Sequence, residues 1–277
     1  MLYLPLRCLV VRARTYGMRR TYGGAVHVVP VSALLVAWGN AWLTGHLGLD
    51  EAVDAVEHAH GPQLVTDGTD EQETPLRHRL GSLRAYGLAQ LRLALPATGD
   101  PLGLTGPPEL NAAGIEAGEV ALGDSPGQAI GLVPAADRRG SSYVGVRWAV
   151  HVARPAMPDT PSLPEAEQQL TVAMRDATQT LVDLDVPRWH PEAAETLAAV
   201  RGGPSDEPAP DLPEAYSPRA HRVAALAGRL ALVLEIALSD EGGAVAASEM
   251  AGRREALRDL DWAIRRARVA AYNAIPR

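Results

Sequence analysis

The sequence predicts an α+β fold, with a small, mainly antiparallel sheet and helices in the N-terminal half and a helical, bundle-like C-terminal half. Three observations lead to this prediction. Residues 143–153 alternate apolar and polar side chains, as a half-buried strand does. Four prolines between residues 155 and 164 bar regular structure. After them, residues 163–184 carry an apolar stripe at helical spacing.

The N-terminal half is expected to alternate short helices and strands. Helices are predicted at residues 31–44, 50–58, 76–86 and 109–117, and strands at 88–96, 129–134 and 143–153. In the last strand one face should be apolar: Val144, Val146, Trp148, Val150 and Val152. The opposite face carries Tyr143, Arg147 and His151. These segments indicate a sheet of three or four strands with one covered face.

The C-terminal half is expected to be helical. Ser162 and Glu165 form a capping box, and Pro164 occupies the first helical position. Further helices are predicted at residues 191–200, 218–238 and 245–274. The predicted organisation is a basic N-terminal tail (1–30), an α+β domain (31–153), a Pro-rich linker (154–164) and a helical domain (165–277) with an internal acidic, Pro-rich linker at 201–218. Two packed halves of one unit are as compatible with the sequence as two independent domains.

The charge distribution argues against nucleic-acid binding. The formal net charge is −7, yet residues 1–30 carry five arginines and no acid, so the rest of the chain has a net charge of −12. Sequence-independent affinity for nucleic acid comes from neutralising phosphates, which such a body does poorly. The segment around 50–58 follows a helical segment as in a helix-turn-helix, but it carries four acids and no arginine.

Two residue counts exclude several chemistries. All 26 basic residues are arginine, so there is no P-loop lysine, no Schiff-base lysine and no Ser-Lys dyad. Cys8 is the single cysteine, which excludes an intramolecular disulfide and a cysteine-based zinc or iron–sulfur cage. We predict no cofactor and no metal. The arginine-only, alanine-rich composition is typical of a high-GC bacterial genome, and the lone cysteine suits a cytoplasmic location.

The N-terminal region offers a membrane alternative. Arg19 and Arg20 precede a largely apolar run at residues 25–43, as in a signal or anchor. Gly39 and Asn40 interrupt this run, and a span needs about 20 predominantly apolar residues. We therefore expect no membrane association, and an anchor through residues 25–43 stays an alternative hypothesis.

Two motifs resemble catalytic or metal sites but fail a geometric test. Residues 123–127 fit the G-x-S-x-G pattern of a nucleophile elbow around Ser125, but Pro126 lacks the N–H that an oxyanion hole would need, so a turn between strands is the better interpretation. His58 and His60 stand two apart, which places them on different sides of a helix, so they could share a metal, with Asp67 and Asp70 as further ligands, only if Ala59 is extended beyond the helix end.

Two arginine-containing groups are candidate binding residues. Arg138, Arg139, Arg147 and His151 lie in or between the two best strands and provide donors for an anionic ligand. Arg254, Arg258, Arg265 and Arg268 follow one flank of the last helix and are candidates for an acidic protein partner. No catalytic residue is predicted.

The leading hypothesis is a non-catalytic interaction or regulatory protein with an unknown protein partner or a homo-oligomeric state, because no catalytic constellation survives its geometry test. The alternatives are a small-molecule enzyme or ligand-binding protein with an anionic ligand in a cleft between the halves, and the membrane-anchored protein.

Overall fold

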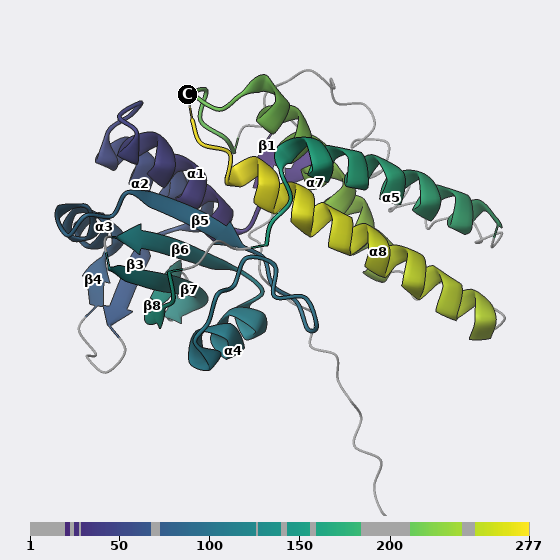
Figure 1. Cartoon of the computed structure of the whole chain (residues 1–277), viewed down its shortest axis with the longest axis horizontal. Coiled ribbons are helices and arrows are strands. Elements are labelled where there is room, and N and C mark those ends of the chain that lie inside the picture. Colours follow the sequence, from purple (N-terminus) through teal and green to yellow (C-terminus); the bar gives the residue numbers. More distant parts are fainter. Residues whose placement is uncertain are drawn as a thin grey trace, which may run out of the picture.

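A computed structural model describes residues 20–22, 25–27, 29–67, 73–125, 127–139, 143–155, 159–183, 211–239 and 247–276. It has a mixed α/β fold with a six-stranded sheet in the order β4-β3-β8-β7-β6-β5 (Figure 1). The strands are β3 (Gln63–Asp67), β4 (Glu73–Pro75), β5 (Gln90–Ala94), β6 (Val120–Ser125), β7 (Gln128–Arg139) and β8 (Tyr143–Ala153). Neighbours are antiparallel except β3 and β8, which are parallel. A separate two-stranded sheet joins β1 (Arg20–Tyr22) and β2 (Ala25–His27).

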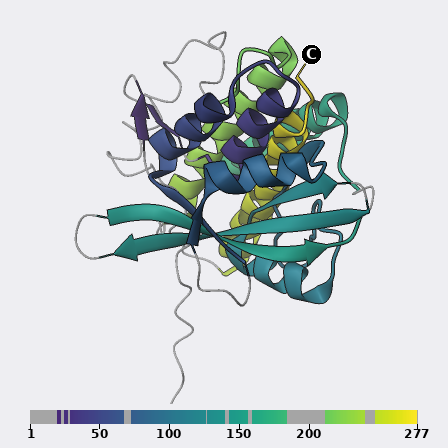
Figure 2. The same cartoon turned by 90° about the vertical axis from the view of Figure 1, so that its left-hand side faces the viewer.

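Helices cover both faces of the large sheet. One face carries α1 (Val31–Leu43), α2 (Leu49–His60) and α3 (Leu76–Ala85), and the opposite face carries α4 (Pro108–Ala117) (Figure 2). α4 packs closely because β7 has glycine beneath it, and a Cβ added at Gly131 would stand 2.5 Å from Cδ1 of Leu110. This residue choice lets the helix approach the sheet directly.

Three long helices form the C-terminal part beyond β5: α5 (Leu163–Asp183), α7 (Pro218–Ser239) and α8 (Ala247–Tyr272) (Figure 1). Most of their buried apolar residues belong to the same hydrophobic cluster as α1–α3 and the sheet. The capping-box prediction is confirmed in part, because the backbone N–H of Ser162 donates to Glu165 Oε2 at 2.9 Å. The hydroxyl of Ser162 binds the same oxygen at 2.7 Å and lowers the pKa of Glu165.

Two asparagine side chains close the outer edge of β5. Asn40 of α1 accepts from the Leu91 N–H and donates to its carbonyl, both at 2.8 Å. Asn273, directly after α8, does the same for Leu93, at 2.6 Å and 3.1 Å. Edge strands expose unpaired backbone groups, and here the two amides pair with them as a neighbouring strand would. The two amides thereby attach α1 and α8 to the edge of the sheet.

The predicted fold class is right at the level of a mixed α/β fold, but the sheet is larger than three or four strands. β3, β4 and β6 were missed. The five residues expected to form one buried face of β8 are buried only in its middle: Trp148 is fully buried, whereas Val144 and Val152, near the two ends of the strand, are 41% and 68% exposed. The helices cover only the middle of this long strand.

Several predictions fall outside the described residues: the N-terminal tail through residue 19, the helix at 191–200, and the acidic linker over residues 201–210. The last part of that linker is described, and there Tyr216 is buried and its hydroxyl donates to the Ala37 carbonyl of α1 at 3.2 Å. The division at 154–164 stays a prediction. None of the helices in the described part of the chain is long and apolar enough to cross a bilayer.

Candidate functional site

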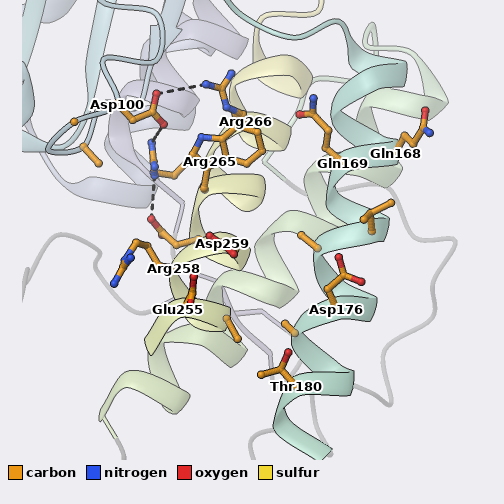
Figure 3. Close-up of a pocket in the computed structure, with 18 of the residues that line it drawn as sticks. Asp100, Gln168, Gln169, Asp176, Thr180, Glu255, Arg258, Asp259, Arg265 and Arg266 are labelled. Carbon is orange, nitrogen blue, oxygen red and sulfur yellow. Dashed lines mark hydrogen bonds and ion pairs between the residues drawn. The ribbon is translucent and has the colours of Figure 1, made fainter. Parts of the chain in front are cut away.

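A groove of about 1260 Å³ runs along the surface between α5 and α8, and the loop at residues 97–100 lines one of its ends (Figure 3). The two helices run in opposite directions, so Gln168 and Gln169 lie beside Arg265 and Arg266 at one end, and Thr180 lies beyond Glu255 at the other (Figure 3). We call these the loop end and the distal end.

Small side chains let the two helices form a concave surface. Ala173 and Ala177 stand four residues apart on α5, and Gly252 and Ala256 stand four apart on α8, and all four line the groove. Positions four apart share one face of a helix, so each helix presents a row of small residues to the groove. Larger apolar groups stand beside them, because Val172 and Trp262 are 48% and 38% exposed.

At the loop end the charged side chains are paired. Arg265 binds Asp100 at 3.0 Å through Nη1 and Asp261 at 3.0 Å through Nε, and its Nη1 also donates to the Leu95 carbonyl at 3.1 Å. Arg266 reaches the other oxygen of Asp100 at 3.5 Å and lies over the Trp262 ring, 4.3 Å from its centre. Partly buried pairs of this kind fasten α8 to the loop that follows β5.

At the distal end the charges are unpaired. Asp176 of α5 and Glu255 and Asp259 of α8 point into or along the groove (Figure 3). All three are exposed, and none has an ion pair or hydrogen bond in the described part of the chain. Arg258 stands among them, also exposed. The distal end therefore carries a net charge of −2 from these four side chains.

The predicted arginine flank of the last helix divides between two environments. Arg254 and Arg258 are exposed, whereas Arg265 is held by Asp100 and Asp261. Arg268 lies deeper, where burial lowers its pKa despite the nearby charges of Asp211, Asp261 and Glu119. A role in partner binding stays a prediction, and of the four only Arg254 and Arg258 present exposed side chains for it.

The predicted anion-binding set is brought together only in part. Arg139 and Arg147 project from the same face of the β7–β8 hairpin, but Asp137, which is 5% exposed, binds Arg139 at 2.8 Å and Arg147 at 3.2 Å. Glu73 of β4 also pairs with both arginines. Two carboxylates thus neutralise two guanidinium groups.

The other two members of that set stand apart. Arg138 points to the opposite face from Arg139, because successive strand residues alternate. His151 pairs in register with Gly131, four residues along β8 from Arg147 and roughly 13 Å away. Anion binding by these residues stays a prediction.

The G-x-S-x-G segment and the His58/His60 pair do not have the geometry of a catalytic or metal site in the described structure. Gly123 to Ser125 form the end of β6, and Ser125 pairs in register with Gln128 of β7, so the G-x-S-x-G segment lies where two antiparallel strands connect. His58 and His60 occupy the last turn of α2. Among the described residues no group of three His, Cys, Asp or Glu side chains is placed to hold a metal.

A buried carboxyl joins the two parts of the molecule. Glu119 precedes β6 and accepts a hydrogen bond from the backbone N–H of Ser32, in the first turn of α1, at 2.7 Å. Burial raises the pKa of Glu119 to about 7, although the Ser32 bond and the charge of Arg268 on α8 oppose the rise. No pattern in the sequence indicates this contact, because Ser32, Glu119 and Arg268 come from distant segments.

Arg258 and Arg265 were named as candidate binding residues from the sequence, but the other groove residues were missed, and one signal for part of them was present. The polar positions of α5 that line the groove, among them Gln168, Gln169, Asp176 and Thr180, recur with the same helical spacing as its buried stripe. This second stripe became recognisable only with α8 beside it.

Comparisons with known proteins cover both parts of the chain. Residues 32–165 match the family described as Rv1486c-like protein, N-terminal domain, and residues 164–269 match the Rv1486c-like protein, C-terminal domain. Both halves of this chain are similar to Rv1486c-like proteins. The groove helices α5 and α8 lie almost entirely within the C-terminal match, and the loop at 97–100 lies within the N-terminal one.

Two relatives come from Mycobacterium tuberculosis. The "Uncharacterized protein Rv1486c" of strain ATCC 25618 / H37Rv is 29% identical over 290 residues, which cover 88% of this chain and 96% of the relative. The "Uncharacterized protein MT1533" of strain CDC 1551 / Oshkosh is 29% identical over 295 residues, with the same coverage of both chains. No solved structure matches the chain.

Proposed function

We propose that this is a non-catalytic interaction protein, and that the groove between α5 and α8 binds an α-helix of a partner protein. The observation that supports this proposal is the shape and lining of the groove. Its α5 wall extends from Glu165 to Thr180, a rise of roughly 22 Å, which suits about four turns of helix. A helix whose apolar face lies in such a groove is a recurrent mode of recognition.

The charge of the lining favours a basic partner. Six carboxylate side chains and three arginines line the groove, a net charge of −3. Two copies of the chain would bring two acidic grooves together, which costs free energy, whereas a basic helix complements the charge. The floor of small residues allows close approach, and Val172 and Trp262 offer apolar contact to the partner.

The alternative of an anionic small molecule has less support. The groove is acidic, and the two arginines of the predicted anion set that lie together are already paired with Asp137 and Glu73. An anion would have to displace both carboxylates or bind a surface of the wrong sign.

The test uses the full chain and a labelled amphipathic peptide of about 18 residues, with leucine and alanine on one face and lysine on the other. Ala173→Tyr fills the floor of the groove, and Thr178→Tyr places the same ring on an exposed position of α5 outside it. Fluorescence anisotropy should show that Ala173→Tyr weakens binding about tenfold or more and that Thr178→Tyr changes it less than about twofold.

Three results would overturn the proposal. The first is equal binding by Ala173→Tyr and the unmodified chain, or no binding by either at about 1 mM peptide. The second is self-association that sedimentation detects and Ala173→Tyr abolishes, which would make a second copy the occupant. The third is binding that occurs only after removal of residues 1–19, which would make this basic segment the occupant.

A further inference from the structure

The groove is polarised from one end to the other. The distal end presents mainly hydrogen-bond acceptors, the carboxylates of Asp176, Glu255 and Asp259, which have no partner in the described part of the chain and outnumber the one arginine beside them, Arg258. At the loop end the carboxylates are engaged, Asp100 and Asp261 by arginine and Glu165 by Ser162. Donors are available there, because the side-chain amides of Gln168 and Gln169, which can also accept, and the indole N–H of Trp262 have no hydrogen bond in the described part of the chain. Figure 3 shows the two glutamines and Asp176 on one wall, at separate levels.

An α-helix is polarised in the same sense as this groove. Its first four N–H groups lack intrahelical acceptors and its N-terminus carries a partial positive charge, whereas its last four carbonyls lack donors and its C-terminus carries a partial negative charge. The carboxylates of the distal end accept hydrogen bonds and attract the positive end of a helix, so they favour the helix N-terminus there. In the reverse direction, the orphan carbonyls of the helix would face three carboxylates, with Arg258 beside them as a donor.

We infer that the partner helix binds in a single direction, with its N-terminal, basic half between Asp176, Glu255 and Asp259 and its C-terminal end against Gln168, Gln169 and Trp262. This inference rests on the proposed function. The bound helix then runs parallel to α8 and antiparallel to α5. Its basic side chains meet carboxylates that come from both walls, and its apolar side chains meet the central alanines.

Two peptides of identical composition test the direction, one with its lysines in the N-terminal half and one with them in the C-terminal half. Lysine near a helix N-terminus opposes the helix dipole, so the first peptide is the poorer helix in isolation and tighter binding by it reports on the groove. We expect the first peptide to bind about tenfold more tightly than the second.

A charge-removal variant checks which residues cause the preference. Glu255→Gln combined with Asp259→Asn should reduce the preference to about twofold or less. Glu51→Gln with Glu57→Gln removes the same charge from α2, outside the groove, and should leave the preference intact. Retention of the full preference in the groove variant would overturn the assignment of these carboxylates.

Disulfide trapping reads the direction itself. In a Cys8→Ser background, a peptide with an N-terminal cysteine should cross-link to Thr180→Cys at the distal end and not to Gln168→Cys at the loop end, because a disulfide forms only when the Cα atoms are within about 7 Å. The reverse pattern, or equal affinity of the two peptides, would overturn the inference and leave the proposed function standing. Failure of both peptides to bind would instead refute the proposed function.

Discussion

The two halves of α8 each carry three arginines but have opposite roles. The C-terminal half, from Asp261 to the Asn273 that follows, is tied to the sheet and its loops by Arg265, Arg266 and the Asn273 amide. The N-terminal half carries Glu255 and Asp259 without partners in the described part of the chain. The charged residues of one helix therefore serve as a structural attachment at one end and as an open surface at the other.

Among the variants that test this comparison, the largest change in the free energy of unfolding is expected for Glu119. Its buried carboxyl interacts with the charge of Arg268 in the C-terminal half of α8. Because the pKa of Glu119 is raised to about 7, the folded state binds more protons than the unfolded state between pH 4.5 and 7, and stability is lost as the pH rises through this range. Glu119→Gln removes that loss. Its unfolding free energy relative to the unmodified chain should rise by about 3 kcal/mol between pH 4.5 and pH 8.

Urea unfolding at a series of pH values measures this difference. Glu116→Gln, on the exposed side of α4, controls for the loss of one negative charge. A pH-independent difference for Glu119→Gln would show that the buried carboxyl does not titrate in this range.

A smaller effect is expected where α8 meets the edge of the sheet. Asn273→Leu leaves the N–H and carbonyl of Leu93 without their side-chain partners, so the free energy of unfolding should fall by about 2 kcal/mol. Asn273→Asp keeps an acceptor for the N–H and should recover part of this loss. Chemical denaturation measures both, and an unchanged midpoint for the leucine variant would contradict the role of the amide.

Removal of the Asp100 carboxylate, which both Arg265 and Arg266 contact, should lower the free energy of unfolding by less than Asn273→Leu does. Asp100→Asn weakens the contacts of Arg265 and Arg266 with the loop but leaves the bond from Arg265 to the Leu95 carbonyl, so we expect a loss of about 1 kcal/mol. Raising the salt concentration should reduce the difference in the free energy of unfolding between Asp100→Asn and the unmodified chain. A difference that does not change with salt would mean that the contact is not electrostatic in origin.

The smallest effect on stability is expected at the distal end. Glu255→Gln removes a carboxylate with no described partner, so the free energy of unfolding should change by less than about 0.5 kcal/mol, while affinity for the basic peptide falls. Thermal unfolding and peptide titration on the same sample separate the two. A loss of stability as large as that of Asp100→Asn would remove the contrast between the two halves of α8.

Most helices could be predicted from the sequence because their periodicity is local. The helix expected at 218–238 is observed at Pro218–Ser239, and the one expected at 31–44 at Val31–Leu43. β6 was missed because both of its faces are buried, so its apolar residues do not alternate. β3 and β4 are short, and β3 pairs with β8 across a long stretch of chain.

The candidate site could not be predicted because it depends on which residues of distant segments face each other. The arginine flank of the last helix was recognised, but its division into paired and exposed members requires Asp100, 165 residues away from Arg265. The anion-binding set was likewise chosen from one hairpin, without Glu73, whose strand was missed. The spacing of residues along one helix or strand predicts which of them share a face. It does not predict which residues of another element lie opposite that face, because this depends on the tertiary fold.

The amide closure of β5 has a consequence for the way the chain is made. Ribosomal synthesis proceeds from the N-terminus, so all six strands leave the ribosome before α8 and Asn273 do. Until then Leu93 offers an open hydrogen-bonding edge to any other nascent chain. Completion of α8 is thus the step that protects the sheet against intermolecular strand addition.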